Sequence, residues 1–531
     1  MKICFSVPFL LCVVCLKTSN AGEVALFDWI DQQIEAKANE QGIPLSQTAD
    51  DATFLRRAYL DFAGTLPEPN KVKKFLKDEN PDKREAVIKE LLSVPTYSKR
   101  MADAFHVMLM ERRGPDENWQ KYLSDAFTNN KPWDQMVREI LNPDFLDETK
   151  RGAGYFITQR LTKSGQQPTD YPGLTRDVGR LFMGVDLQCA QCHKHLTVKD
   201  YKQIDFNGLF VTYQNLKLNN PSGDYKTNWV SENLLDKEYE FVSVFTEKAK
   251  TTPPRIPFGK SIPIPELEKD AKWEVAPDRR KKIVGVPAFR PLKEVAENLA
   301  SSDNPWFAQN AVNRIWFLMM GRGIVEPLDL QHTANPPSHP EILERLATEF
   351  TKLNFDIRWL LEQLARTKTY QRSSALPESA QGQLPAPQFF ATALERPLTA
   401  LQLQNAFLQA TGESHSEELE EAFYDAFANP PKEPELQVNP TLRSALFLRN
   451  STYMDSALQP KEGNLISKLQ NIKDDKKLIE SAYLSIYSRF PDDTERKLLS
   501  EHLSANKDNR LEAIQQLTWS LLSSMEFFAN H

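Results

Sequence analysis

The chain has 531 residues, a formal net charge of −7 and 26% charged residues, which is the composition of a folded protein of two to four domains. Its 19 glycines are about half the usual ~7%, whereas its 35 prolines are above the usual ~5%, which disfavours glycine-looped nucleotide folds and hairpin-rich β folds. No apolar run reaches 18 residues, which excludes a multispanning membrane protein. The chain is net negative and has no basic block, so we do not expect it to bind nucleic acid.

Residues 1–21 predict a secretory signal peptide. Lys2 supplies the positive charge, residues 3–16 form a short apolar stretch, and Ser19 and Ala21 are the small residues expected before a cleavage site at Gly22. An uncleaved N-terminal anchor is the alternative. Cleavage leaves 63 basic and 72 acidic residues, a net charge of −9, and no membrane span in the mature chain. We therefore expect an exported protein of the periplasm or cell surface.

The hydrophobic pattern predicts a mainly α, multi-helical fold of two helical domains with a small β-containing insert between them. Residues 22–213 show helical periodicity, as where Ile30, Ile34 and Ala38 share one face. Residues 214–285 are proline-rich and contain the alternating stretch 239–245, which predicts a partly β insert. Helical periodicity returns near Leu292, so residues 286–531 form the predicted C-terminal helical domain.

Two segments at opposite ends of the chain resemble each other. Segments 58–97 and 482–527 both contain Ala-Tyr-Leu with a proline nine residues after the alanine, and both then contain Leu-Leu-Ser followed by an aromatic residue. If this echo is a duplication, both segments should form the same helices in the same order and pack as a pseudo-symmetric pair. The alternative is that helix–proline–helix segments look alike by chance.

The motif that carries chemistry is Cys-Ala-Gln-Cys-His at residues 189–193. Cys-x-x-Cys-His is the attachment signature of c-type haem. Residues i and i+3 of a helical turn lie on one face, so the thiols of Cys189 and Cys192 can both reach the vinyl groups of one haem. His193 would then be the proximal iron ligand. This predicts one haem c and an electron-transfer or redox role in the cell envelope, with an envelope redox or surface protein as partner.

Other interpretations of the motif remain open. A Cys189–Cys192 disulfide would close a small loop in an oxidising compartment. A zinc site could use the two cysteines with His193 or His195, although a second cysteine pair is missing. In either case the chain would be a non-haem structural or binding protein of the envelope. On the haem interpretation His195 is too close to His193 to bind the opposite face of the iron, and should point to solvent or donate a hydrogen bond that orients the site.

The sequence does not identify a distal iron ligand or a catalytic group. No methionine closely follows His193, and the remaining candidates are His106, Met108, Met110, Met319, Met320 and His332. Phosphate-binding loops, metalloprotease motifs and nucleophile elbows are absent from the sequence. Catalytic residues are therefore unknown and enzymatic activity is left open. We expect Arg56, Arg57 and Asp61 to form a buried ion-pair network.

Several of these segments resemble a known family pair. Residues 54–61 with Gly64 and Pro67, and residues 187–195, look like the planctomycete cytochrome-like family catalogued as domain of unknown function 1549. Residues 313–316, 321–325, 335–340, 370–374 and 519–531 resemble its usual partner, domain of unknown function 1553. The resemblance implies an exported, planctomycete-type bacterial protein, named cytochrome-like for its Cys-x-x-Cys-His motif, and it supplies no reaction.

The chain departs from the family pattern at four positions. Lys194 stands where an acid is common, and Leu196 stands where proline usually follows the second histidine. Leu401 and Asn405 replace acidic residues expected within the segment 396–405. Any role that requires those acids is not expected here.

Overall fold

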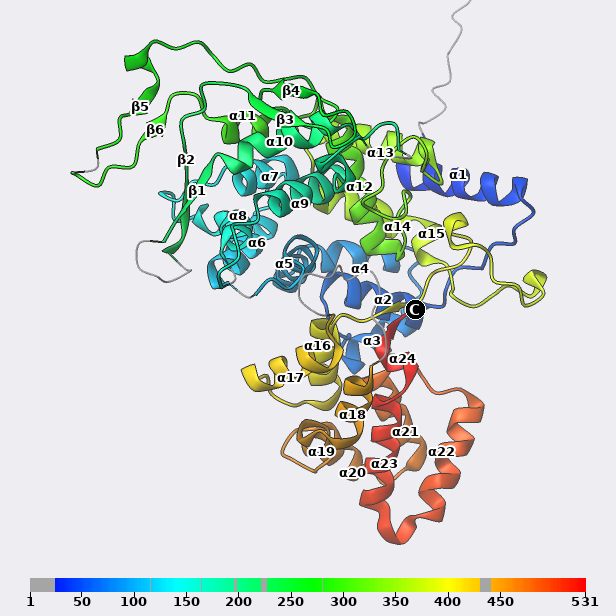
Figure 1. Cartoon of the computed structure of the whole chain (residues 1–531). Coiled ribbons are helices and arrows are strands. Elements are labelled where there is room, and N and C mark those ends of the chain that lie inside the picture. The colour runs from blue at the N-terminus through cyan, green and yellow to red at the C-terminus, as the bar shows by residue number, and fades with distance from the viewer. Residues whose placement is uncertain are drawn as a thin grey trace, which may run out of the picture.

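A computed structural model describes residues 24–114, 116–163, 165–194, 198–220, 227–278, 280–429 and 441–531. The fold is mainly α with small two-stranded sheets, which confirms the fold class predicted from the sequence. Figure 1 shows a larger upper body, from which the insert extends, and a smaller lower body built by about the last quarter of the chain. The predicted signal peptide, residues 1–21, lies outside the described residues.

The first part of the chain is a succession of short helices with clear local start signals. Asp50 and Asp170 accept hydrogen bonds from backbone N–H groups in the first turns of α2 and α9, as N-cap residues do. A proline occupies the first turn of α3, α5 and α9, where its missing N–H costs nothing. These helices are α1 (Leu26–Glu40), α2 (Asp51–Phe62), α3 (Pro69–Lys77), α4 (Lys83–Leu91), α5 (Pro95–Met110), α6 (Glu117–Thr128), α7 (Trp133–Leu141), α8 (Tyr155–Leu161), α9 (Tyr171–Met183) and α10 (Gln203–Gln214).

The insert consists of antiparallel two-stranded ribbons along the upper edge of the molecule in Figure 1. The alternating stretch 239–245 forms a strand only as far as Val242, and Ser243–Phe245 belong to the turn of a hairpin. The strands are β1 (Leu216–Asn219) with β2 (Trp229–Glu232), β3 (Tyr239–Val242) with β4 (Ala249–Thr252), and β5 (Trp273–Val275) with β6 (Val286–Pro287).

Helices resume after the insert and continue to the end of the chain. The upper body receives α11 (Pro291–Leu299), α12 (Pro305–Met320), α13 (Pro340–Lys352), α14 (Ile357–Arg366) and α15 (Lys368–Gln371). The lower body contains α16 (Ala400–Thr411), α17 (Glu417–Phe427), α18 (Leu442–Asn450), α19 (Thr452–Ala457), α20 (Leu465–Gln470), α21 (Asp475–Ile486), α22 (Asp493–Ala505), α23 (Arg510–Leu522) and α24 (Met525–Phe528). Strand β7 (Arg396–Pro397), just before α16, pairs with β8 (Ala529–Asn530) at the chain end.

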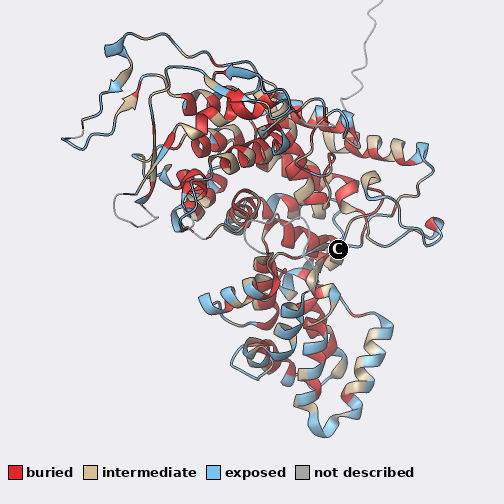
Figure 2. Ribbon diagram, viewed as in Figure 1, coloured by how far each residue is buried: buried red, intermediate tan, exposed pale blue. Residues whose placement is uncertain are grey.

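Two hydrophobic cores organise these helices, and Figure 2 shows them as the buried interiors of the two bodies. The first core is continuous across the insert and includes residues from Ile30 to Phe390. The second core consists mainly of residues from Leu398 to Phe527. The boundary between the two cores therefore lies between residues 390 and 398. This boundary is inside residues 286–531, which the sequence analysis predicts to be one helical domain.

The two similar segments form helices in the same order, as the sequence echo predicts. Helices α2 and α21 each have 12 residues, and each is followed by a left-handed residue at the same spacing, Gly64 with φ 68° and Ser488 with φ 62°. The next helices, α3 and α22, begin two residues after Pro67 and Pro491 respectively. A third helix and the start of a fourth then follow in both segments. The α-helices of the two segments therefore agree in number and order, apart from an additional 3₁₀ turn, Lys507–Asn509, in the second segment.

Candidate functional site

The Cys-x-x-Cys-His motif follows the C-terminus of α9 in a short 3₁₀ turn, Cys189–Gln191. Helix α9 ends at Gly184, whose φ of 69° is the left-handed conformation that glycine adopts without strain. The chain then buries Leu187 and Ala190 in the first core, and this leaves Cys189 and Cys192 on the exposed side of the turn. Both thiols are free, at positions i and i+3 of one turn.

The β3–β4 hairpin and α10 hold the backbone of the motif. The side-chain amide of Gln203, in α10, donates to the carbonyl oxygen of Cys192 at 3.1 Å and to that of Val242 at 3.0 Å. The backbone N–H of Val244 donates to the same Cys192 carbonyl at 3.2 Å. The tip of the hairpin is thereby fixed beside the second cysteine.

The hydrogen bond of His193 determines which ring nitrogen is available. Its Nδ1 lies 2.6 Å from the carbonyl oxygen of Lys194, and because a carbonyl can only accept, Nδ1 carries the proton. The lone pair of Nε2 is left for a metal or a proton. The ring of Phe245 lies 4.6 Å from the His193 ring, between centroids, and Val242, Val244 and Phe245 are exposed beside the motif.

Most other predicted site residues lie away from the motif or beyond what the structure describes. His195 lies outside the described residues. Met110, Met319 and Met320 are buried in the first core. His332 lies against the ring of Tyr201, with 5.5 Å between centroids, and His106 and Met108 line a cavity described below. Among the described residues there is no group of three or more His, Cys, Asp or Glu placed to hold a metal ion.

The residues of the expected network around 56–61 are buried, but Asp61 forms its ion pair with Arg396 and not with Arg56 or Arg57. Asp61 accepts from Arg396 Nη2 at 2.7 Å, from the Tyr370 hydroxyl at 2.8 Å and from the Asn530 amide at 2.9 Å. Arg56 donates instead to the backbone carbonyls of Ile486 at 3.1 Å, Glu526 at 3.0 Å and Phe527 at 3.1 Å. This network joins α2 to four segments more than 300 residues away in the sequence, around Tyr370, Arg396, Ile486 and residues 526–530, and we assign it a structural role.

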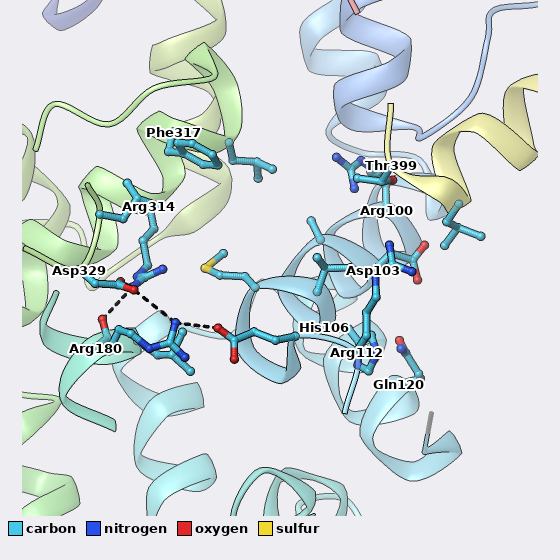
Figure 3. Close-up of a pocket in the computed structure, with 18 of the residues that line it drawn as sticks. Arg100, Asp103, His106, Arg112, Gln120, Arg180, Arg314, Phe317, Asp329 and Thr399 are labelled. Atoms are coloured by element: carbon cyan, nitrogen blue, oxygen red, sulfur yellow. Dashed lines mark hydrogen bonds and ion pairs between the residues drawn. The ribbon is translucent and has the colours of Figure 1, made fainter. Parts of the chain in front are cut away.

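The structure reveals a second candidate site, a cavity of about 120 Å³ between α5, α12 and α16 (Figure 3). Its walls include apolar side chains from α5, α9, α12 and α16 and the ring of Tyr424 in α17. Polar groups lie on both sides. In Figure 3, Asp103, His106, Arg112 and Gln120 gather on one side, and Arg180, Arg314 and Asp329 gather on the other.

Two of the cavity residues have strongly displaced pKa values. Burial raises the pKa of the Asp103 carboxyl to about 7, although Arg100 and Lys99 oppose this effect. Burial also lowers the pKa of His106 to about 4, and the charge of Arg112 lowers it further. The indole N–H of Trp119 donates to His106 Nδ1 at 3.1 Å, so the single proton of the neutral ring is on Nε2.

A buried charge network fixes the opposite wall of the cavity. Arg180 contacts Glu111 at 2.6 Å, Asp177 at 3.0 Å and Asp329 at 3.3 Å, and Arg314 pairs with the same Asp329. Glu111 and Arg112, which follow α5, have φ angles of 47° and 56°. Consecutive non-glycine residues in the left-handed region are uncommon and occur preferentially at functional sites.

Local sequence patterns give little indication of this cavity, because its walls come from segments about 300 residues apart. The available signal was the pair Asp103 and His106, which are three residues apart and therefore share a face in the mainly apolar second half of α5. Leu401 and Asn405, where the resemblance noted in the sequence implies acidic residues, also lie here. Leu401 lines the cavity, and both residues line an adjoining pocket.

Family models match two long parts of the chain. Residues 29–217 match the family described as PSCyt2, protein of unknown function (DUF1549), and residues 293–438 match PSD1, protein of unknown function (DUF1553). No curated protein and no solved structure is significantly similar to the chain. None of the described helices combines the length and the apolar character that crossing a membrane requires.

Proposed function

For a chain that belongs to these two paired families of unknown function, we propose that Cys189 and Cys192 attach one c-type haem, that His193 ligates its iron, and that the protein transfers electrons in the cell envelope. The observation that carries the proposal is the placement of both free thiols on the exposed side of a single turn. Two thioether bonds to one porphyrin require thiols at this spacing and with this access.

The protonation of His193 supports the proposal. An iron ligand must present an unprotonated ring nitrogen, and metal-bound histidines usually donate their other N–H to a carbonyl or carboxylate. His193 has this arrangement, because Nδ1–H is directed to the Lys194 carbonyl and Nε2 keeps its lone pair. The histidine therefore needs no change of tautomer to bind iron.

The hairpin beside the motif supports it as well. A porphyrin is a large apolar surface, and its attachment to an exposed turn requires apolar side chains nearby. Val242, Val244 and Phe245 project at the hairpin tip and are exposed, whereas most apolar residues of the chain are buried. Gln203 joins the hairpin to the motif through its two hydrogen bonds, so these side chains have a fixed position relative to the thiols.

Each residue has a separate role in this proposal. When bound, the haem supplies one-electron chemistry at its iron. The two cysteines hold it covalently, His193 donates to the iron, and Phe245 packs against the His193 ring and restrains its rotation. Export to the envelope is part of the proposal, because haem c attachment in bacteria takes place outside the cytoplasm and residues 1–21 have the features of a signal peptide.

Expression of the full chain with the haem-attachment machinery tests the proposal. We expect a coloured protein whose mass exceeds that of the apoprotein by one haem and which gives a pyridine haemochrome spectrum. Cys189→Ala combined with Cys192→Ala should be colourless, whereas His193→Ala should keep the covalent haem and change its absorbance. A colourless wild-type protein of apoprotein mass would refute the proposal, and one bound zinc lost equally in His193→Ala and His195→Ala would favour the metal-clip alternative.

A further inference from the structure

We propose that the cavity between α5, α12 and α16 is a binding site for a small organic anion, which it takes up together with a proton on Asp103. This site is separate from the Cys-x-x-Cys-His motif and does not depend on haem. The anionic group would lie on the side of Asp103, His106 and Gln120, and the apolar part of the ligand would lie against the rings and aliphatic side chains of the walls.

The hydrogen-bonding groups on that side are matched to an acceptor. His106 presents Nε2–H, because its Nδ1 is occupied by Trp119. Gln120 presents its amide, and neither this amide nor the carboxyl of Asp103 makes a hydrogen bond to another described residue. Once Asp103 is protonated, each of the three groups can donate a hydrogen bond to an acceptor on this side of the cavity.

The charges around the cavity favour the same ligand. The described lining contains four arginines, Arg100, Arg112, Arg180 and Arg314, and three acids, Asp103, Glu111 and Asp329. Arg180 and Arg314 are paired with acids on the opposite wall, and Arg100 and Arg112 are the cations on the side of Asp103. An anion beside Asp103 disfavours the ionised carboxylate, since two carboxylates that share a site cannot easily both be charged. Binding and protonation are consequently linked.

Size and wall composition limit the ligand. The volume of about 120 Å³ is comparable to the ~150 Å³ engineered apolar cavity that binds benzene. Phe317, Leu318 and Leu401 supply apolar contacts, and Tyr424 adds an aromatic face against which Arg112 lies at 4.8 Å from the ring centroid. These dimensions fit a compact aromatic or branched carboxylate and exclude long-chain or polymeric ligands from the enclosed part.

Calorimetric titration of the full chain with benzoate, with benzamide as the neutral isostere, tests the proposal. The pKa of Asp103 is raised to about 7, so its protonated fraction falls from about nine-tenths at pH 6 to one-tenth at pH 8, and the apparent Kd for benzoate should rise about tenfold. At pH 8 binding should take up nearly one proton, measured from the dependence of the heat on buffer ionisation. The other charged or titratable groups around Asp103 are Lys99, Arg100, His106 and Arg112 on or next to α5, Glu413 after α16, and Glu420 on α17.

Three variants complete the experiment. Asp103→Asn should bind benzoate with a Kd that changes less than twofold between pH 6 and 8, because its amide donates at either pH. Asp125→Asn, on the exposed surface of α6, changes the net charge equally and should keep the tenfold change. Leu401→Trp fills the cavity and should abolish binding while the unfolding temperature is retained. Equal Kd values for benzoate and benzamide, the wild-type pH dependence in Asp103→Asn, or unchanged binding in Leu401→Trp would each overturn the proposal.

Discussion

Leu60 of α2 and Leu484 of α21 occupy equivalent positions in the two similar helical units, and each is fully buried in the core of the opposite body. Leu60 belongs to the core formed mainly by residues 398–527, and Leu484 belongs to the core that begins at Ile30. Reciprocal contact of this kind is what a two-fold interface between like units produces. Each of the two similar units therefore contributes a buried leucine to the core of the other body.

Leu60→Ala and Leu484→Ala should each destabilise the whole chain. Deletion of a fully buried leucine side chain leaves a cavity and costs about 2–5 kcal/mol. Because each leucine lies in the opposite core, hydrogen exchange should increase in the body that receives the side chain. Leu498→Ala is the control, since that leucine of α22 is exposed and its loss should change the free energy of unfolding by less than about 0.5 kcal/mol. Equal effects of all three substitutions would contradict the reciprocal packing.

Asp61→Asn should be among the most destabilising conservative substitutions in the chain. It removes the charge that compensates Arg396, and an uncompensated buried charge costs about 3–5 kcal/mol. The free energy of unfolding in urea measures the effect, with Asp125→Asn as the exposed control. A loss of less than about 1 kcal/mol would show that Arg396 finds another partner or reaches solvent.

The apoprotein should expose two reactive thiols without denaturant. Cys189 and Cys192 are the two cysteines that follow the predicted signal peptide, and both are free and exposed. Because both thiols are exposed, a chromogenic disulfide reagent should titrate two thiols per chain processed at residue 21. Protein prepared under reducing conditions that still shows no reactive thiol would favour the disulfide alternative.

Mild acid should weaken the fold through His339. This histidine is buried against Phe390, and burial lowers its pKa from 6.5 to about 4, so between these values the unfolded chain binds more protons than the folded one. The free energy of unfolding therefore decreases as the pH falls. Between pH 7 and pH 5, protonation of His339 in the unfolded chain should lower it by about 2 kcal/mol. His339→Gln should reduce the loss by that amount in urea unfolding, whereas His415→Gln, at an exposed site, should not.

Two other groups contribute to the same profile in opposite directions. His106 has the same sign as His339, because burial lowers its pKa to about 4. Asp103 changes the free energy of unfolding in the opposite direction. Its folded pKa of about 7 lies above the unfolded value, so its contribution to stability is lost as the pH rises from 4 to 7. Comparison of wild type with His339→Gln removes both effects, since they are common to the two proteins.

Local patterns predict the helices well because the relevant physics is local. The face formed by Ile30, Ile34 and Ala38 is buried as its spacing indicates. The thiol pair lies on one turn as expected from its separation in sequence. The alternating stretch 239–245 indicates the β character of the insert but not where the strand ends, because alternation continues through Ser243–Phe245, where the chain turns within the hairpin.

Contacts between distant segments could not be predicted in the same way. Arg56, Arg57 and Asp61 are close in sequence and of opposite charge, which favours an ion pair among them. In the fold, the partner of Asp61 is Arg396, and Arg56 reaches backbone carbonyls that no side-chain pattern reveals. The cavity at Asp103 depends in the same way on helices that come together only in three dimensions.

The hydrogen bonds of Arg56 also affect the order in which the chain acquires its structure during synthesis. Their acceptors, Ile486 and Phe527, lie 430 and 471 residues later in the sequence. While the ribosome is still extending the chain, the guanidinium of α2 has no carbonyls to receive its protons, and burial of that helix would be costly. Helix α2 therefore reaches its final packing only when the last helices have been translated, and a nascent or C-terminally shortened chain should leave this helix open to chaperones and proteases.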